Sequence, residues 1–332
     1  MFRYAVLACV VLWSPALWAV NLAIEPLQPI EALPPAPAEQ VALGKQLFFD
    51  VRLSHDNSIS CASCHHLDAG GADVSRFSYG VAGREGGVNT PTVFNAALNF
   101  AQFWDGRAGS LQEQINGPIT SSFELASSWS EVLAKLKKDD ALQVAAKKVC
   151  TQGLDADCVR NAIAAFEQTL VTPNARFDRY LKGDEDAITP QEKHGYALFK
   201  SYGCIACHQG RNVGGNLYQI LGVMADYFKD FPSDNPASLG RFNVTQNPKD
   251  KHRFKVPSLR FAVLTPPYFH DGSQKNLRKT IRTMATYQLG RKIPDEDVTA
   301  IIRFLYTLPG EYQGKSLEPK EQTQLADMKE QQ

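Results

Sequence analysis

Two segments of this 332-residue chain have the form Cys-x-x-Cys-His, at residues 61–65 and 204–208. This spacing is the attachment signature of c-type haem, in which two thiols form thioethers with the porphyrin and the next imidazole ligates the iron. A zinc site needs more nearby thiols or imidazoles than either segment offers, and a thioredoxin-like pair needs a surrounding βαβ pattern that neither segment has. We therefore expect two covalent haem c groups. The expected haem-binding residues are Cys61, Cys64 and His65 in the first motif and Cys204, Cys207 and His208 in the second.

The N-terminus has the pattern of an export signal. Arg3 precedes an apolar run over residues 4–18, which Pro15 interrupts and which is too short for a membrane span. Residues 1–19 are therefore predicted to be a signal peptide that is cleaved near Ala19. Haem is attached to such motifs outside the bacterial cytoplasm, so the expected location is the periplasm.

The cysteine count leaves one pair to explain. Of seven cysteines, Cys9 lies in the predicted signal peptide and four belong to the haem motifs, which leaves Cys150 and Cys158. In an oxidising compartment this pair is expected to form a disulfide across a short loop, and two unreactive thiols are the alternative.

Charge and hydropathy exclude some partners. The chain has 35 basic and 35 acidic residues, so nothing indicates a nucleic-acid or membrane partner. No second apolar segment is long enough to span a bilayer.

An internal repeat divides the chain into two halves. Gly44-x-x-Leu47-Phe48 precedes the first motif and Gly195-x-x-Leu198-Phe199 precedes the second, in segments of helical periodicity where the glycine would permit close helix crossing. Each half also ends in a predicted helix with an apolar stripe. The matched stripe positions are Val159, Ala162, Ile163 and Phe166 in the first half and Val298, Ile301, Ile302 and Leu305 in the second.

The repeat predicts a mainly α fold of two cytochrome c-like domains with long loops. We place the first domain at 20–183, the second at 184–310, and a polar tail at 311–332. Thr189-Pro190-Gln191-Glu192 has the form of a capping box with proline at the first helical position, so a helix is expected to begin there.

The sixth ligand of each iron decides the function, because an electron-transfer haem has two strong protein ligands whereas a catalytic haem keeps one face open. Residues 67–193 contain no histidine or methionine, so the simplest interpretation is an open first haem. His55 is interpreted as a solvated loop residue. A ligand from elsewhere is the alternative, and the candidates are His194, His252, His270 and Tyr79.

The second half offers sulfur ligands. Met284 is predicted to lie in a loop before the closing helix, where it can fold over the distal face of the second haem. Met224 falls in an apolar stretch that is typical of packing. We predict Met284 as the ligand, with Met224 as the alternative, and Met/His ligation raises the reduction potential.

Seven short motifs follow one another in the chain, at residues 47–50, 89–92, 103–107, 117–118, 176–178, 256–260 and 267–272. Together they resemble the bacterial dihaem cytochrome c peroxidases and their relative MauG, from about Gly44 to Gly310. The resemblance implies reduction of hydrogen peroxide to water at the N-terminal haem. It also implies electrons from a small periplasmic donor, a cytochrome c or a copper protein, which enter through the C-terminal haem. A homodimer is one option for the oligomeric state.

The resemblance implies roles for individual residues. Gln114 and Glu124 match the acid–base pair over the peroxidatic haem, Trp104 matches a tryptophan between the haems, and Met284 matches the distal methionine. Glu124 would move a proton from the proximal to the distal oxygen of peroxide so that water leaves, and its burial would raise its pKa. Arg107 could pair with a haem propionate, since a guanidinium suits carboxylates.

A calcium site between the domains is also implied. Asn89, Thr265 and Pro267 match it, the last two through backbone oxygens, as suits a hard cation.

Val81 departs from the family pattern. Typical peroxidases of this family carry a distal histidine that must leave the iron upon reductive activation, and valine at that position cannot ligate. MauG also lacks that histidine, but it uses a tyrosine where this chain has Met284. We therefore expect an N-terminal haem that is open without reductive activation. The alternatives are a MauG-like enzyme that oxidises a partner protein and a non-catalytic dihaem electron carrier or peroxide sensor.

Overall fold

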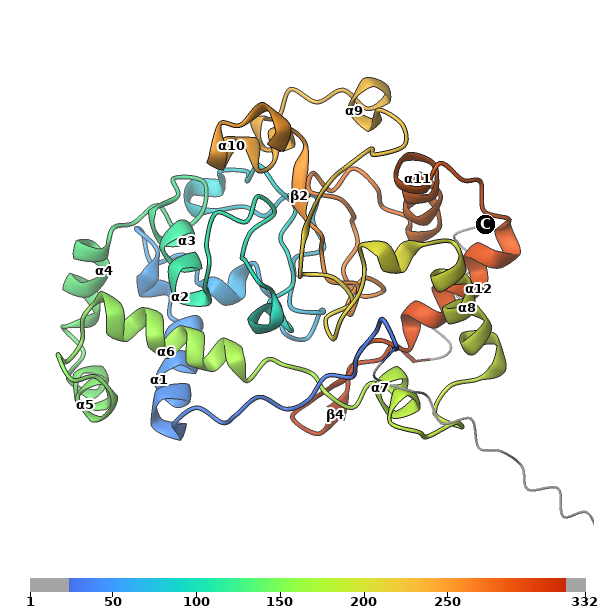
Figure 1. Cartoon of the computed structure of the whole chain (residues 1–332). Coiled ribbons are helices and arrows are strands. Elements are labelled where there is room, and N and C mark those ends of the chain that lie inside the picture. The colour runs from blue at the N-terminus through green and yellow to red at the C-terminus, as the bar shows by residue number, and fades with distance from the viewer. Residues whose placement is uncertain (1–23, 321–332) are drawn as a thin grey trace, which may run out of the picture.

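The computed structural model describes residues 24–320, and Figure 1 shows a mainly helical molecule with long loops. The predicted signal peptide and the end of the predicted tail lie outside these residues. The longer helices are α1 (Ala38–Phe48), α4 (Trp129–Leu136), α5 (Asp140–Val149), α6 (Ala156–Gln168), α8 (Pro190–Ser201), α11 (Leu277–Leu289) and α12 (Asp295–Tyr306). The shorter helices are α2 (Leu111–Gln114), α3 (Asn116–Thr120), α7 (Arg176–Leu181), α9 (Tyr227–Asp230) and α10 (Phe242–Thr245).

Strands are few and short. β1 (Tyr218–Ile220) pairs antiparallel with β2 (Arg253–Lys255), and β3 (Glu311–Tyr312) pairs antiparallel with β4 (Lys315–Ser316). The prediction of a mainly α fold is confirmed.

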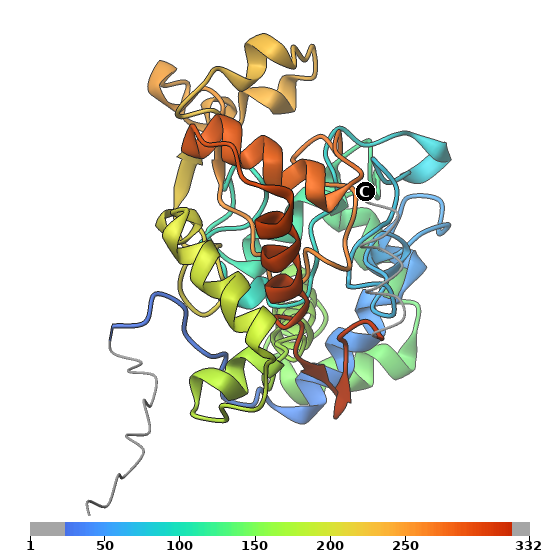
Figure 2. The ribbon, with the colours of Figure 1, turned by 90° about the vertical axis from the view of Figure 1, so that its right-hand side faces the viewer.

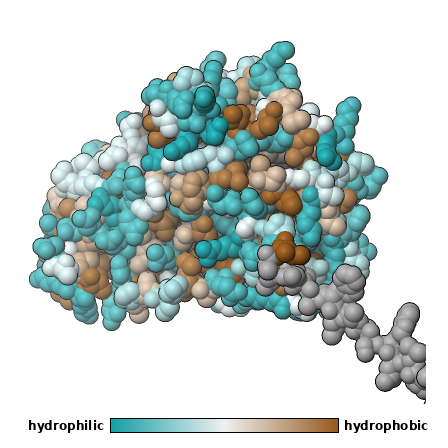
Figure 3. All heavy atoms as spheres, viewed as in Figure 1, coloured by the Kyte–Doolittle hydropathy of each residue, from teal (hydrophilic) through white to brown (hydrophobic). Residues whose placement is uncertain are grey.

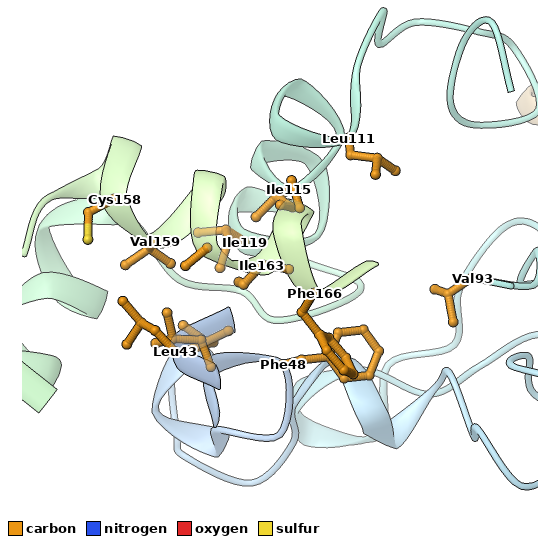
Figure 4. Close-up of a cluster of buried hydrophobic side chains, with 14 of the residues drawn as sticks. Leu43, Phe48, Val93, Leu111, Ile115, Ile119, Cys158, Val159, Ile163 and Phe166 are labelled. Atoms are coloured by element: carbon orange, nitrogen blue, oxygen red, sulfur yellow. The ribbon is translucent and has the colours of Figure 1, made fainter. Parts of the chain in front are cut away.

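A crossed pair of helices anchors the first half. A Cβ on Gly44 of α1 would lie 1.8 Å from the carbonyl oxygen of Ala162 in α6, so a side chain there would force the helices apart. Figure 4 shows the apolar side chains that fill the interface, among them Leu43, Phe48 and Phe166. The predicted role of Gly44 is confirmed.

The second half repeats this arrangement with α8 and α12, which lie side by side in Figures 1 and 2. A Cβ on Gly195 would lie 1.9 Å from the carbonyl oxygen of Ala300. Helix α8 begins as predicted, with reciprocal hydrogen bonds between Thr189 and Glu192 and with Pro190 in the first turn.

The predicted disulfide is also present. Cys150, at the end of α5, is bonded to Cys158 in the first turn of α6. The bond therefore ties the closing helix of the first half to the helix before it.

The buried apolar side chains form two clusters that largely follow the two halves. The first cluster extends from Leu43 to Leu170 but also includes Phe261, and the second extends from Phe177 to Leu308 but also includes Leu27. The strands β3 and β4 lie in the predicted polar tail, and Tyr312 packs against the first cluster, with its ring 5.4 Å from that of Phe94. Segments from both ends of the described chain thus lie against the opposite half.

The surface mixes polar and apolar residues. On the face seen in Figure 3, hydrophobic residues are interspersed among hydrophilic ones. Within residues 24–320 no helix combines the length and the hydropathy that crossing a bilayer requires.

Candidate functional site

The first Cys-x-x-Cys-His motif forms a tight 3-10 turn, η2 (Cys61–Ser63). The Ser63 hydroxyl accepts a hydrogen bond from the Ser60 amide at 3.0 Å, and the His65 amide donates to the carbonyl oxygen of Cys61 at 3.1 Å. This turn brings the two thiols and the imidazole to one segment, and both thiols are free. The residues therefore fit covalent attachment of a haem.

The ring of His65 is oriented as a metal ligand needs. Its Nδ1 lies 3.2 Å from the carbonyl oxygen of Gly71, and because a carbonyl can only accept, Nδ1 carries the proton. Burial lowers the pKa of His65 to about 4, so the ring is neutral at neutral pH. The Nε2 lone pair is then free for iron, which is the arrangement seen for metal-bound histidines.

The second motif has the same form, with η5 (Cys204–Ala206) and two free thiols. Burial lowers the pKa of His208 to about 4, while nearby backbone oxygens of Val213 and Pro257 act in the opposite direction. Both motifs thus present a neutral, half-buried imidazole beside a pair of thiols.

A cavity of about 260 Å³ adjoins the second motif. Cys204, Cys207, His208 and Met284 line it, together with apolar side chains such as Phe199 and Ile301. An apolar cavity beside thiols and an imidazole fits a porphyrin ring.

Met284 and Met224 lie in different surroundings. Met284 lines the cavity, but it lies within helix α11, so the prediction of a loop at this position was wrong. Met224 does not line the cavity and is 61% exposed, with its side chain against Gly290, so the prediction that it packs inside an apolar stretch was also wrong.

Two loops that are distant in the sequence meet beside the first motif. The Val81 amide donates to the carbonyl oxygen of Glu124 at 2.9 Å, and the Arg84 guanidinium donates to the carbonyl oxygen of Ser122 at 3.0 Å. A Cβ on Gly80 would lie 2.1 Å from the carbonyl oxygen of Phe123, so this approach requires glycine. The loop that carries Val81 is therefore docked on the loop that carries Glu124.

The Glu124 carboxyl lies close to the first motif. Burial raises its pKa, whereas a hydrogen bond from Ser121 and the positive charge of Arg107 act to lower it. The negative charge of Glu124 in turn contributes to the raised pKa of both Cys61 and Cys64. A carboxyl group whose pKa is raised by burial therefore lies beside the thiols of the first haem motif.

Gln114 ends the short helix α2 and is half-buried. Its side chain makes no hydrogen bond to any residue within 24–320, which leaves the amide available to a ligand. Arg107 pairs with both carboxylate oxygens of Asp105 at 3.0 Å, and its guanidinium lies 3.4 Å from the centre of the Phe103 ring.

Trp104 is held at both ends. Its indole Nε1 donates to the carbonyl oxygen of Asn89 at 2.9 Å, and its own carbonyl oxygen accepts from the Lys255 amide at 2.8 Å. Although Trp104 belongs to the first half, it lines the cavity of the second motif. It therefore lies where the two halves meet.

The residues predicted to bind calcium also meet at this junction. Asn89, Thr265 and Pro267 all line the cavity of the second motif. The Asn89 amide nitrogen donates to the carbonyl oxygens of Ser75 and Arg76, at 3.3 Å in both cases, so its Oδ1 is the atom left for a cation. Within 24–320 no group of three His, Cys, Asp or Glu side chains is arranged to hold a metal ion.

His55, His252, His270 and Tyr79 contact other protein groups, and His194 is exposed. His55 is largely exposed and contacts Glu131 at 3.0 Å, as expected for a solvated loop residue. Tyr79 is 55% exposed and donates its hydroxyl to Glu85 at 3.2 Å. His270 is buried and lines the cavity of the second motif, and its Nε2 lies 3.0 Å from the Ser238 hydroxyl. The Nδ1 of His252 lies 2.7 Å from the carbonyl oxygen of the same serine.

Glu167 and Lys255 are buried charged residues that were not singled out from the sequence. Glu167 in α6 has a pKa raised to about 8 by burial, and its charge contributes to the raised pKa of Cys61. Lys255 in β2 has a pKa lowered to about 8 by burial. Glu167 follows Phe166, and Lys255 follows Phe254. A charged residue next to apolar residues was the sequence signal that could have indicated burial at both positions.

The two motifs, each on a helical half of the same design, define a dihaem protein of cytochrome c type. The family model described as di-haem cytochrome c peroxidase matches residues 38–186. The chain is 47% identical over 289 residues to cytochrome c peroxidase Ccp of Escherichia coli K12, and 45% identical over 293 residues to cytochrome c551 peroxidase of Nitrosomonas europaea. These alignments cover 87% and 88% of this chain, and 62% and 86% of the two relatives. The chain belongs to the di-haem cytochrome c peroxidase family.

The chain spans less than two thirds of the length of the E. coli relative and most of the length of the Nitrosomonas europaea relative. Among solved structures, a MauG-like protein associated with microbial copper homeostasis shares the fold, with a TM-score of 0.71. It is 23% identical, and the match covers 90% of this chain and 95% of that one. The family resemblance read from the sequence motifs is confirmed.

Proposed function

We propose that this chain is a periplasmic dihaem peroxidase that reduces hydrogen peroxide to water at its N-terminal haem. A small redox protein, a cytochrome c or a copper protein, would supply electrons through the C-terminal haem. Membership of the peroxidase family supports this proposal. The observation that carries it is the half-buried Glu124 carboxyl beside Cys61 and Cys64, because peroxide cleavage needs a group that can both take and give a proton.

Haem held by Cys61, Cys64 and His65 would supply an iron that binds peroxide and exchanges electrons with it. Glu124 would take the proton of the proximal peroxide oxygen and give it to the distal oxygen, so that water leaves. Burial raises its pKa and so favours the protonated form, which suits a group that must give a proton as well as take one. The Gln114 amide would orient the peroxide by hydrogen bonding.

Trp104 would carry electrons between the two sites. It is fixed by hydrogen bonds to Asn89 and Lys255, and it lines the cavity of the second motif while belonging to the first half. His208 and Met284, which line the same cavity, would hold the iron of the C-terminal haem, and two protein ligands suit electron transfer. Arg107 would pair with a propionate of the peroxidatic haem.

The N-terminal site would be ready without prior reduction. Val81 lies where family members carry a ligating histidine, and its side chain has no donor atom. The hydroxyl of Tyr79, the nearest alternative along the chain, is bonded to Glu85. No ligand would then have to leave before peroxide can bind.

A calcium ion would lie at the junction of the halves. Asn89 Oδ1 and the backbone oxygens of Thr265 and Pro267 would supply oxygen ligands only, which this ion prefers. The hydrogen bonds from Asn89 to the loop at Ser75 and Arg76 would couple the ion to the loop before Val81.

Steady-state kinetics test the proposed function. Mass spectrometry should first show two haems attached to the periplasmic protein. Peroxide turnover is then measured with reduced cytochrome c and with a reduced copper protein as donors. Sustained turnover supports the proposal. Two attached haems without turnover by either donor would favour a sensor or carrier instead.

A further inference from the structure

The cavity beside the second haem motif contains a buried cation. Among the described residues that line it, Lys255 is the only lysine, arginine, aspartate or glutamate. The residue is 7% exposed, and its neighbours Phe254 and Val256 are buried as well. A buried ammonium group costs free energy unless an opposite charge accompanies it.

No described residue supplies that opposite charge. Within residues 24–320 no carboxylate lies within 4.0 Å of the Lys255 Nζ, although sixteen other ion pairs meet that criterion. Burial is the sole cause of its lowered pKa, so no neighbouring anion acts on it. A molecule bound in the cavity would therefore meet a lysine that no described carboxylate neutralises.

The backbone fixes Lys255 at this wall of the cavity. It ends strand β2, opposite Tyr218 of β1, and its amide donates to the carbonyl oxygen of Trp104 at 2.8 Å. Strand pairing and this hydrogen bond keep the residue from turning outward. The ammonium group is therefore a permanent feature of the cavity next to Trp104.

A haem in this cavity brings carboxylates with it. The thioethers to Cys204 and Cys207 hold the vinyl edge of the porphyrin, and the two propionates project from another edge of the same ring. We propose that Lys255 forms an ion pair with a propionate of the C-terminal haem and thereby sets the reduction potential of that haem. This inference rests on the proposed function only in that the second motif carries haem.

The charge of Lys255 is expected to raise the reduction potential of the C-terminal haem. A propionate that has lost its cation places an uncompensated negative charge near the iron, which favours the ferric over the ferrous state. Removal of the Lys255 charge should therefore lower the reduction potential. Lys255 would be a positioning and tuning residue, since it touches the haem edge rather than peroxide.

The test is a spectroelectrochemical titration of the C-terminal haem in the full holoprotein. In Lys255→Met the ratio of ferric to ferrous haem at a fixed potential should rise about tenfold or more, about 59 mV for one electron. Lys255→Arg should stay close to the wild type because it keeps the charge. The matched control is Lys249→Met, which removes the same charge from an exposed residue, and it should leave the potential unchanged.

Two results would overturn the inference: an unchanged potential in Lys255→Met with both haems attached, or an equal shift in Lys249→Met. If Lys255→Met does not retain its second haem, Lys255→Gln gives the same comparison with a hydrogen-bond donor kept. The wild-type protein gives an independent test at low and high sodium chloride. A potential that depends on chloride would show that an exchangeable anion, not the propionate, pairs with Lys255. Absence of peroxide turnover would sink the proposed function but would leave these potentials interpretable.

Discussion

The amide of Val81 donates a hydrogen bond to the carbonyl oxygen of Glu124 at 2.9 Å. Val81, which we propose to occupy the position of a distal ligand, is thus joined through the backbone to Glu124, which we propose as the acid–base group. Any change in the loop at Val81 is therefore expected to act on the position of Glu124 as well as on the iron. Two predictions test the two ends of this bond.

Val81→His should restore a distal ligand. An imidazole at this position would convert the resting oxidised protein toward two low-spin haems and make activity depend on prior one-electron reduction. Electron paramagnetic resonance reports the spin states, and stopped-flow mixing with peroxide reports the reactivity. The control is Val81→Ala, which cannot ligate and should keep one high-spin haem and immediate reaction. A wild-type protein that is fully low-spin and inert would show that another residue closes the site.

Glu124→Gln should slow peroxide cleavage by a factor on the order of 10² or more, because the amide cannot exchange a proton. Haem content and the spectra of the C-terminal haem should not change. Rapid mixing at several peroxide concentrations measures the rate constant. Wild-type kinetics in this variant would remove Glu124 from the mechanism.

Met284→Ala should lower the potential of the C-terminal haem and slow electron delivery, since loss of a thioether ligand removes the stabilisation of the ferrous state. The spectra should change at one haem only. Met224→Ala is the matched control, because that methionine is mostly exposed and does not line the cavity. A loss of the low-spin signal in the control, but not in Met284→Ala, would mean that the wrong sulfur was assigned.

Glu167 predicts a pH dependence of stability. Burial raises its pKa to about 8 in the folded protein, so the folded state keeps a proton that the unfolded state releases above about pH 4.5. The folded state is therefore destabilised progressively as pH rises from about 4.5 to 8, by an amount on the order of a few kcal/mol. Glu167→Gln should remove this loss and melt above the wild type at pH 8, with a smaller difference at pH 5.

Thermal unfolding followed by circular dichroism at the two pH values measures the effect. Glu39→Gln serves as the control because Glu39 is exposed at the start of α1, and it should show no such trend. Equal melting of Glu167→Gln and the wild type at pH 8 would mean that the buried carboxyl is compensated in another way.

Much of the fold could be read from the sequence because its determinants are local or periodic. Gly44 and Gly195 each stand three positions before a Leu-Phe pair in the helix that precedes a haem motif, and close helix crossing explains the glycine in both halves. The capping box at Thr189 and the pairing of Cys150 with Cys158 likewise depend on residues that are near each other in the chain.

The site was less predictable where it depends on tertiary contacts. Met284 was expected in a loop, but its helix α11 runs along the cavity, and spacing from a haem motif does not distinguish a helix from a loop there. The contact between Val81 and Glu124 uses backbone atoms only, so it leaves no side-chain pattern. Lys255 was overlooked because lysine is ordinarily a surface residue, and only the fold shows it inside a cavity.

The first and last parts of residues 24–320 each pack against the opposite half. Leu27 is buried in the second cluster, and Gln28 accepts a hydrogen bond from the buried Arg260 through its carbonyl oxygen. At the other end, Tyr312 and Leu317 pack on the first cluster. A cut between the halves near Gly183 would separate Leu27 from the second cluster, and Tyr312 and Leu317 from the first cluster. Each fragment would then lose part of its apolar core. The two halves are therefore expected to fold as one unit, so that a change that unfolds one half would abolish both the proposed electron entry and the proposed peroxide reduction.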